Sequence, residues 1–213
     1  MTPDLFPETV GDLALGDGAM VLRGFALAID ADLLAAIDQV TAAAPFRHLV
    51  TPGGLRMSVA MTNCGTVGWV SDRRGYRYDP VDPDSGRPWP AMPALFAGLA
   101  ARAAQAAGYA GFAPDACLIN RYAPGTRLTL HQDRDERDYM APIVSVSLGL
   151  PATFLFGGGE RRDRPRRVPL AHGDVVVWGG PTRLAFHGVA PLAEGLHPLT
   201  GRLRLNLTFR RAR

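Results

Sequence analysis

The sequence predicts an α+β protein in which two helices precede a double-sheet jelly roll, and two observations lead to this fold class. First, apolar residues at three- and four-residue spacing, typical of amphipathic helices, are found only in the first half of the chain. Second, the other half is a series of short apolar segments separated by turn signals at regular intervals. Such segments need no parallel crossovers, so we expect two packed antiparallel sheets.

The first half contains two predicted strands, two predicted helices and one irregular stretch. The strands are expected at 18–27 (GAMVLRGFAL) and 57–64 (MSVAMTNC), and the helices at 31–44 (ADLLAAIDQVTAAA) and 93–108 (PALFAGLAARAAQAAG). Between Gly65 and Trp89 the chain is rich in glycine, arginine and tyrosine and has several X-Pro bonds. We expect an irregular recognition loop there rather than core.

The second half predicts eight strands. They are expected at 117–123 (CLINRYA), 127–133 (RLTLHQD), 143–150 (IVSVSLGL), 152–158 (ATFLFGG), 166–171 (RRVPLA), 174–180 (DVVVWGG), 183–190 (RLAFHGVA) and 202–211 (RLRLNLTFRR). No linker, internal repeat or low-complexity tract divides the chain, so one domain accounts for all of it. Within it, about 1–115 would form an N-terminal extension with a recognition segment, and about 116–213 the jelly-roll core.

Composition and charge set limits on location and partners. The chain of 213 residues has a net charge of +3, and all 23 basic residues are arginine, which permits nucleic-acid binding without demonstrating it. Cys64 and Cys117, the two cysteines, form no close pair in the sequence, as expected for buried thiols in a reducing compartment. The beginning, MTPDLFPETVGD, does not resemble a secretory signal, and no apolar stretch has membrane-spanning length. We therefore expect a cytoplasmic protein without membrane contact.

Two histidines and one aspartate predict a metal site. In LTLHQD apolar and polar residues alternate, so His131 and Asp133 would project from the same face of a strand. His187, in RLAFHGVA, would complete two imidazoles and one carboxylate, the ligand set of non-haem Fe(II) oxygenases. The pattern also allows a chance pair of structural residues, or a binding module with structural zinc. Zinc sites of that kind normally have four protein ligands, and the sequence offers three.

The last predicted strand places polar residues on one face. From Arg202 to Arg210 the residues alternate strictly, with leucine and phenylalanine on one face and Arg204, Asn206, Thr208 and Arg210 on the other. The polar face could be a solvated sheet edge, protected by charge from pairing with other chains. It could instead line a cavity in which Arg204 and Arg210 each bind a carboxylate through paired hydrogen bonds. A small molecule with two carboxylates, such as 2-oxoglutarate, would fit that second interpretation.

Several longer motifs resemble one known family. NRYAPGTRLTLHQDRDE, APIVSVSLGLPATFLFGG, HGDVVVWGG, the segment around His187 and RLNLTFR are similar, in this order and spacing, to the AlkB family of Fe(II)- and 2-oxoglutarate-dependent dioxygenases that repair alkylated nucleic acid. TPGGLRMSVAMTNCG, followed by Trp69 and Tyr76, resembles the nucleotide-recognition segment of that family. The resemblance covers about Pro45 to Arg210. It implies a double-stranded β-helix, the jelly roll of this family, with an N-terminal extension over its open mouth.

The resemblance also implies cofactors and a reaction. Fe(II) would bind to His131, Asp133 and His187, which would be the catalytic residues, and 2-oxoglutarate would be the cosubstrate together with O2. The residues expected to bind 2-oxoglutarate are Asn120, Tyr122, Arg204, Asn206 and Arg210. The implied reaction is oxidative demethylation of 1-methyladenine and 3-methylcytosine, with release of formaldehyde and succinate. Single-stranded DNA is the expected substrate, with RNA as a second candidate, and we expect the enzyme to act as a monomer.

For the substrate, the resemblance points to residues outside the metal site. Trp69 would stack on the damaged base opposite His131, and Asp135 would read the exocyclic amine. The substrate-binding residues expected are Trp69, Tyr76, Asp135, Arg161, Thr51, Met57 and Ser58. Without the resemblance, Trp69 could be a loop anchor, and Asp135 and Arg161 could belong to solvated turns. A dioxygenase acting on protein or a small molecule is the main alternative. No role is assigned to His48, His172 and His197, since most such histidines are structural.

Overall fold

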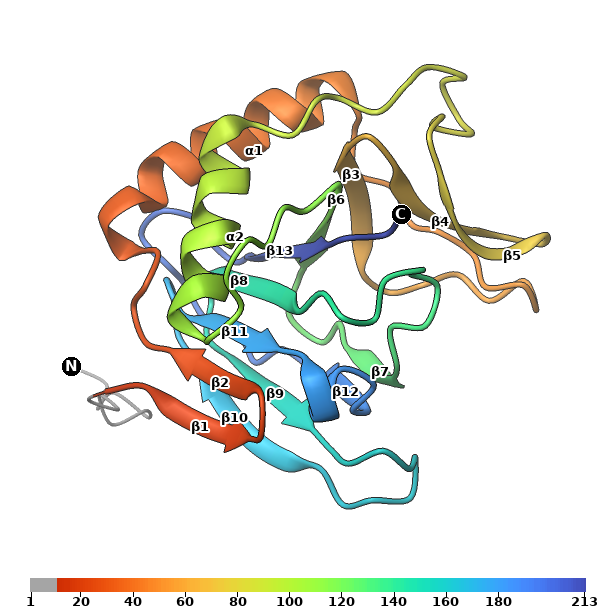
Figure 1. The fold of residues 1–213 in the computed structure, drawn as a ribbon. Coiled ribbons are helices and arrows are strands. Elements are labelled where there is room, and N and C mark those ends of the chain that lie inside the picture. The colour runs from red at the N-terminus through yellow and green to blue at the C-terminus, as the bar shows by residue number, and fades with distance from the viewer. Residues whose placement is uncertain (1–10) are drawn as a thin grey trace.

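The computed structural model describes residues 11–213 and contains two facing β-sheets, with two helices on the outer side of the larger sheet (Figure 1). The helices are α1 (Asp30–Ala43) and α2 (Ala94–Ala106). The strands are β1 (Leu13–Gly16), β2 (Ala19–Leu22), β3 (Ala60–Gly65), β4 (Gly68–Asp72), β5 (Gly75–Asp79), β6 (Ala116–Tyr122), β7 (Leu128–His131), β8 (Ile143–Gly149), β9 (Ala152–Phe156), β10 (Arg166–Leu170), β11 (Val175–Trp178), β12 (His187–Val189) and β13 (Arg204–Arg210). Most of the segment in which a secretory signal was considered lies outside the described residues.

The larger sheet has seven strands in the order β1-β2-β11-β8-β13-β6-β3, and the smaller has four in the order β10-β9-β12-β7. All strand pairs of both sheets are antiparallel. Strands β4 and β5 form a separate two-stranded hairpin that projects beside the sheets (Figure 1). This arrangement is the expected jelly roll with an N-terminal extension.

Strand β13 separates the apolar core from a polar interior. Its alternate residues Leu207 and Phe209 are fully buried and pack with Leu33 and Ile37 of α1 and Leu99 of α2. Each such side chain contributes about 1.5–3 kcal/mol by leaving water. Because side chains alternate along a strand, the polar residues of β13 point the other way, between the two sheets. The packing of the helices therefore fixes which face of β13 lines the interior.

The predicted elements are confirmed, with three corrections. All eight strands expected after residue 116 are present, as are both helices and the strands at β2 and β3. The expectation of an irregular loop between Gly65 and Trp89 was wrong in part, because β4 and β5 pair there from Gly68↔Asp79 to Asp72↔Gly75. Strand β1 was not predicted, since its LALG pattern is too short to stand out. Strand β7 ends at His131, so Asp133 lies in the following loop and not on the strand itself.

Two further expectations concern cysteines and membranes. Cys64 and Cys117 face each other across β3 and β6, and both are buried free thiols. Burial raises the pKa of the Cys117 thiol well above its ordinary value, so the thiol stays protonated. Among the described residues, no helix is long and apolar enough to span a lipid bilayer.

Candidate active site

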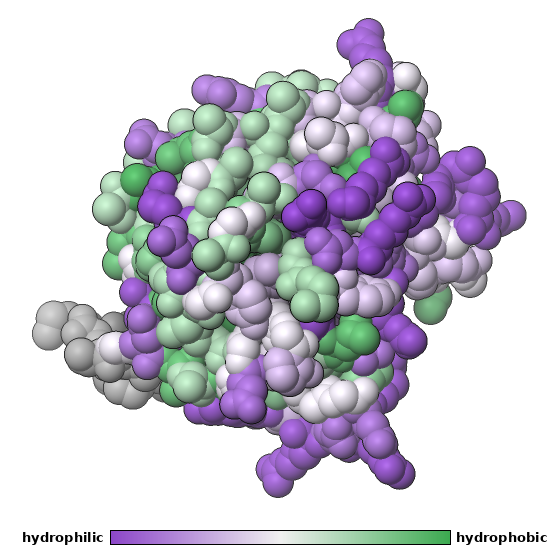
Figure 2. Space-filling model, viewed as in Figure 1, coloured by the Kyte–Doolittle hydropathy of each residue, from purple (hydrophilic) through white to green (hydrophobic). Residues whose placement is uncertain are grey.

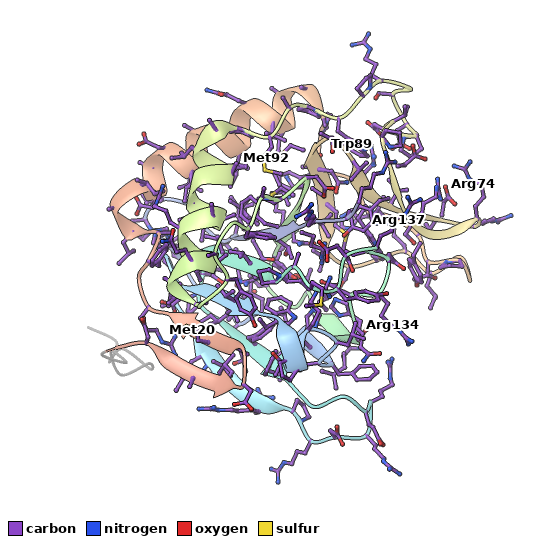
Figure 3. All side chains as sticks on the ribbon, in the orientation of Figure 1. Met20, Arg74, Trp89, Met92, Arg134 and Arg137 are labelled. Atoms are coloured by element: carbon purple, nitrogen blue, oxygen red, sulfur yellow. The ribbon has the colours of Figure 1, made fainter. Side chains whose placement is uncertain are left out.

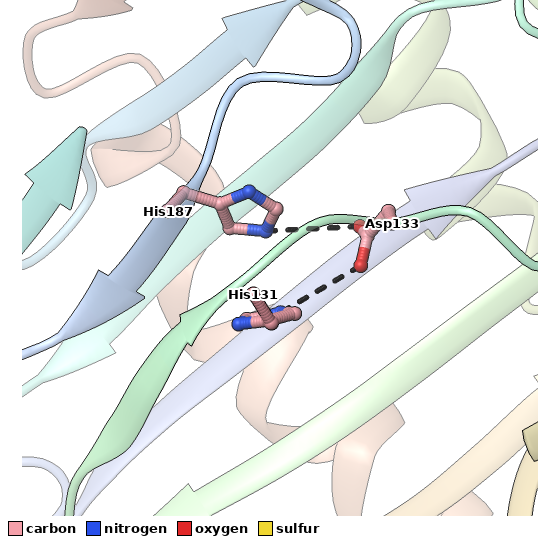
Figure 4. Close-up of side chains that lie close together, drawn as sticks. All are labelled: His131, Asp133 and His187. Carbon is pink, nitrogen blue, oxygen red and sulfur yellow. Dashed lines mark ion pairs between the residues drawn. The ribbon is translucent and has the colours of Figure 1, made fainter. Parts of the chain in front are cut away.

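Three side chains with metal-ligating atoms meet between the sheets (Figure 4). His131 ends β7 and His187 begins β12, and the two are direct partners in the antiparallel pairing of these strands. Asp133 follows in the loop after β7. Its Oδ1 lies 3.6 Å from Nε2 of His131, and its Oδ2 lies 3.8 Å from Nε2 of His187. One ligand atom from each residue lies within 4.8 Å of the others, so one ion could contact all three.

The backbone fixes which nitrogen of each imidazole is free. Nδ1 of His131 lies 2.9 Å from the carbonyl oxygen of Thr129, and Nδ1 of His187 lies 3.0 Å from that of Ala185. A carbonyl oxygen only accepts, so in the neutral rings Nδ1 donates and Nε2 keeps its lone pair. Both lone pairs are therefore available on the side of Asp133. Metal-ligating histidines are commonly oriented by this kind of outer hydrogen bond.

The protonation states of the buried ligands also suit a metal. Burial, with a smaller contribution from His131, lowers the pKa of His187 to about 3, so this imidazole is neutral. Burial alone would raise the pKa of Asp133, but Arg210 and the two histidines outweigh it and hold the pKa below its ordinary value. A neutral imidazole and an ionised carboxylate are the forms that bind metal ions.

The donor set fits a particular class of metal. Two imidazole nitrogens and one carboxylate are the protein ligand set of non-haem Fe(II) sites, whereas structural zinc normally has four protein ligands. Across residues 11–213 no second group of three such side chains comes this close together.

Arg204 provides a second charged group in the interior. The residue is 1% exposed, and its guanidinium lies over the ring of Tyr122, 4.9 Å from the centroid. One nitrogen, Nη2, donates to Oγ of Ser147 at 2.9 Å, whereas Nε and Nη1 have no hydrogen-bond partner in the protein. A buried guanidinium normally has its donors paired, so the free edge fits an anionic group bound through two hydrogen bonds. A carboxylate of 2-oxoglutarate has that shape and charge.

The other predicted 2-oxoglutarate residues divide into two groups. Tyr122 faces Arg204 and Asn120 faces Asn206 across β6 and β13, and Oδ1 of Asn120 also lacks a partner. In contrast, the Asn206 amide donates to Oγ of Ser145 and to the carbonyl of Val146, both at 2.8 Å. Asn206 is therefore already held within the sheet, whereas Arg204 and Asn120 have free polar atoms.

Ser145 and Ser147 are partners of the site that the sequence analysis did not single out. They alternate with buried valines in IVSVSLG of β8 and lie opposite Thr208 and Asn206 of β13. Their hydroxyl oxygens accept from the side chains of Asn206 and Arg204, respectively. Hydroxyl residues at every second position of an otherwise apolar strand were a signal that could have identified them.

Arg210 lies beside the candidate metal ligands rather than beside Arg204. Its Nη2 and Nε lie 2.7 and 2.8 Å from Oδ2 of Asp133, and both side chains are buried. Burial alone would lower the pKa of Arg210. Asp133 and other nearby acidic groups outweigh burial and hold the pKa above its ordinary value, so the guanidinium stays charged. Its expected contact with 2-oxoglutarate stays a prediction, and its contact with Asp133 was not predicted.

Trp69 and Asp135 form one wall beside the metal site. The indole Nε1 of Trp69 donates to Oδ2 of Asp135 at 2.7 Å. The Trp69 ring also stacks on Tyr76, with centroids 5.6 Å apart and planes inclined by 12°. Asp135 follows Asp133 by two residues, so this contact joins the β4–β5 hairpin to the loop that carries a candidate metal ligand. Three of the residues predicted to bind the substrate therefore form one contiguous group.

The four remaining predicted substrate residues lie on two other parts of the chain, residues 51–58 and the β9–β10 tip. Met57 packs in the same apolar cluster as Trp69, and Oγ of Ser58 donates to the carbonyl of Arg127 at 3.1 Å. Thr51 lies in a turn, where its Oγ1 accepts from the amide of Leu55 at 3.1 Å. Arg161 is exposed near the β9–β10 tip. Its guanidinium lies 6.0 Å from the ring of Phe186, the residue before His187.

Hydrophilic side chains gather over the β4–β5 hairpin and at the β9–β10 tip (Figure 2). Arg74, Arg134 and Arg137 lie on the hairpin side of the molecule (Figure 3). All three are exposed, and the tip with the start of β10 adds five exposed arginines, namely Arg161, Arg162, Arg164, Arg166 and Arg167. A surface of this charge is suited to a phosphate backbone, although solvated turns have the same composition.

The three other histidines have structural partners. Nδ1 of His48 lies 2.9 Å from the carbonyl of Met57, and Nε2 of His172 lies 2.9 Å from Oδ2 of Asp30. His197 packs against His172, with ring centroids 4.4 Å apart. They lie outside the group of candidate metal ligands.

Comparisons with known proteins agree with this geometry. The model of the 2OG-Fe(II) oxygenase superfamily matches residues 18–210. The chain is 60% identical to the alpha-ketoglutarate-dependent dioxygenase AlkB of Escherichia coli over 198 residues, 93% of this chain and 92% of that protein. It is 41% identical to the DNA N(6)-methyladenine demethylase ALKBH1D of Arabidopsis thaliana over 111 residues, 46% of this chain and 25% of that protein. The solved structure of OsALKBH1 superposes with a TM-score of 0.83 at 29% identity, covering 94% of this chain and 99% of that one.

Proposed function

Because the chain belongs to the 2OG-Fe(II) oxygenase superfamily, and within it to the AlkB dioxygenases, we propose that it repairs alkylated DNA by oxidative removal of methyl groups from the bases. The enzyme uses Fe(II), 2-oxoglutarate, which is alpha-ketoglutarate, and O2. 1-Methyladenine and 3-methylcytosine in single strands are the proposed substrates, with RNA as a second candidate. Formaldehyde and succinate are the proposed products, and the proposed active form is a monomer.

One observation carries the proposal: the loop that carries Asp133 contacts the polar face of β13 through Arg210 and the β4–β5 hairpin through Asp135. Arg204 offers two unpaired donors on that face of β13, and the hairpin contributes Trp69, whose indole donates to Asp135. A metal site alone would fit many oxidations. An oxidation that consumes 2-oxoglutarate and takes a flat nitrogenous base needs all three parts together.

His131, Asp133 and His187 would hold Fe(II) through Nε2, a carboxylate oxygen and Nε2. The bound iron, with 2-oxoglutarate and O2, supplies the oxidation of an unreactive C–H bond. Arg204 would bind the carboxylate of 2-oxoglutarate distant from the metal through Nε and Nη1, supported by Asn120 and Tyr122. The protein thereby orients the cosubstrate before any oxidation takes place.

Trp69 would hold the target base by stacking and by attraction of a cationic methylated ring to its π face. Asp135, already an acceptor for the Trp69 indole, would favour that positive charge and accept from the exocyclic amine. A hydroxylated N-methyl group is an unstable hemiaminal, which breaks its C–N bond to give formaldehyde and the unmethylated base. Since the methyl lies on the pairing edge, the base must be unpaired or flipped out, which supports the preference for single strands.

The test is release of formaldehyde from a single-stranded oligonucleotide with one 1-methyladenine or 3-methylcytosine, given Fe(II) and 2-oxoglutarate. We expect formaldehyde to be released together with succinate, and no formaldehyde from the unmethylated oligonucleotide. Succinate formed with a peptide or small molecule, and no formaldehyde from any methylated oligonucleotide, would refute the DNA-repair assignment. The same assay with a methylated RNA oligonucleotide ranks RNA against DNA.

A further inference from the structure

A buried group of charged side chains beside the candidate metal site is centred on a residue that has no part in the proposed reaction. Its centre is Glu136, in the loop between β7 and β8, whose side chain is 2% exposed. Oε1 of Glu136 accepts from the hydroxyl of Tyr78 at 2.6 Å and lies 3.4 Å from Nε of Arg210. Oε2 accepts from Nη2 of Arg183 at 3.2 Å. A carboxylate this far from water is held by its partners and in turn fixes their positions.

This group connects the β4–β5 hairpin to the metal carboxylate. Tyr78 lies on β5 directly opposite Trp69 of β4, so the two residues are fixed in one hairpin register. At the other end, Arg210 binds the carboxylate of Asp133 through Nη2 and Nε. Tyr78 of the hairpin is therefore connected to Asp133 through two side chains, Glu136 and Arg210.

Arg183 holds the same loop from its other side. Besides Glu136, it donates through Nη1 to the carbonyl of Asp133 at 3.1 Å and through Nε to that of Ala141 at 3.1 Å. The side chain is 3% exposed. Arg183 thus fixes the loop that carries Asp133, Asp135 and Glu136 at three points, in addition to the contacts of Arg210.

The charges of the group balance in pairs. Arg183 and Arg210 are opposed by Asp133 and Glu136, all four of them buried. If Glu136 lost its charge, both guanidiniums would have Asp133 as their remaining buried anion. Arg210 would be drawn more strongly to Asp133, and a divalent cation would meet a more positive surrounding.

We propose that Glu136 is a positioning residue, which keeps the β4–β5 hairpin in place relative to Asp133 through Tyr78 and keeps Asp133 available to a divalent cation by sharing Arg210. The part of this inference that concerns the hairpin rests on the proposed function, and the part that concerns the cation does not. A purely structural Glu136, which only neutralises Arg183, would affect stability without changing either property.

The first experiment measures the affinity of the purified protein for Mn(II) by calorimetry. We expect Glu136→Gln to weaken Mn(II) binding about tenfold, in the range found when an outer partner of a metal ligand is removed. Asp135→Asn is the matched control: it removes a carboxylate from the same loop, but from one that does not contact Arg210, and should leave the affinity near wild type. Unchanged or tighter Mn(II) binding in Glu136→Gln would overturn this part of the inference.

The second experiment uses Tyr78→Phe, which removes one hydroxyl and leaves the buried ion pairs of Glu136 in place. We expect the ratio of base demethylation to substrate-free turnover of 2-oxoglutarate to fall by roughly three- to tenfold, as for residues coupled through one network. Tyr109→Phe is the matched control, since its hydroxyl bonds to the carbonyl of Gly18 far from the hairpin. Both variants should bind Mn(II) like the wild type.

A double variant distinguishes a shared pathway from two separate effects. If Tyr78 acts through Glu136, Tyr78→Phe should lower the ratio no further in a Glu136→Gln background. A wild-type ratio in Tyr78→Phe, or full additivity in the double variant, would overturn the hairpin link. Absence of demethylation by the wild type would instead refute the proposed function, and the Mn(II) titration would still decide the role of Glu136. If Glu136→Gln does not fold, Glu136→Asp replaces it, because the shorter carboxylate draws back from Arg210 and should weaken Mn(II) binding in the same direction.

Discussion

The interior face of β13 and the β4–β5 hairpin carry different parts of the same site, and they are built differently. Every residue of β13 is buried, and the strand is paired on both sides by β6 and β8. The hairpin has no sheet neighbours, and its Tyr76 is 47% exposed. The hairpin is joined to the loop after β7 by two side-chain hydrogen bonds, Trp69 to Asp135 and Tyr78 to Glu136.

This difference separates chemistry from substrate choice. The groups that would hold iron and 2-oxoglutarate lie on paired strands or next to them, where a shift would break many backbone hydrogen bonds at once. The groups that would choose the base lie on an element that can be altered or moved at little cost to the core. We therefore expect variants of the site residues in the sheet to abolish turnover of 2-oxoglutarate. Variants in the hairpin should reduce demethylation of nucleic acid more than they reduce turnover of 2-oxoglutarate.

The largest effect should come from Asp133→Ala. It removes the one carboxylate of the candidate metal site, and we expect demethylation to fall by at least about a hundredfold, because even an outer partner of a ligand can cost that much. Circular dichroism should show the fold intact at 25 °C, since no apolar core is emptied. Asp135→Ala, two residues along the same loop, should still bind Mn(II). Wild-type turnover by Asp133→Ala would show that Asp133 is not a metal ligand.

Arg204→Lys tests the anion site while keeping the charge. A lysine cannot reproduce the paired donors Nε and Nη1, so we expect the KM for 2-oxoglutarate to rise roughly 10- to 100-fold. Steady-state kinetics with varied 2-oxoglutarate measures it. Arg202→Lys, on an exposed arginine of the same segment, is the control and should behave as wild type. An unchanged KM would show that Arg204 is a structural residue of the sheet.

Trp69→Ala tests the hairpin. We expect demethylation to fall about tenfold, the size of a lost base-stacking contact, and substrate-free turnover of 2-oxoglutarate to fall much less. Trp69→Phe keeps an aromatic face but loses the indole donor to Asp135, so it should retain most activity. Equal losses in both assays for Trp69→Ala would make Trp69 a packing residue of the apolar cluster that it shares with Met57.

The smallest effect should come from Arg161→Ala at the exposed β9–β10 tip. If Arg161 contacts one phosphate, we expect the KM for oligonucleotide to rise about two- to threefold in the variant. The slope of the logarithm of the binding constant against the logarithm of salt concentration should become shallower by about one. Fluorescence anisotropy at several salt concentrations measures both. Arg102→Ala on α2, on the outer side of the larger sheet, is the control. An unchanged salt dependence would leave Arg161 as a solvated turn residue.

The sequence predicted which residues share a face of a strand, because that follows from a short alternating pattern. It did not predict contacts between residues far apart in the chain. The alternation in RLRLNLTFRR predicted which residues of β13 share a face, and the structure confirms it. The pairing of Arg210 with Asp133 crosses 77 positions and leaves no local signal. Glu136 is one acid among several in DRDERD, and nothing in that run distinguishes a buried carboxylate from a solvated one. The Gly65–Trp89 stretch was misread because its prolines obscured two strands that contain none.

The direct pairing of His131 with His187 restricts where the chain can change its length. Side chains alternate along a strand, so one residue inserted into β7 or β12 would turn an imidazole to the opposite face. The pairing of these strands already shifts register once, between His187↔His131 and Val189↔Leu128. At that shift a Cβ on Gly188 would lie 2.6 Å from the carbonyl oxygen of Leu128, so the irregularity depends on a residue without a side chain. The β9–β10 tip has no such restriction. Insertions and deletions should therefore be tolerated at the β9–β10 tip, whereas within β7 or β12 they should abolish activity.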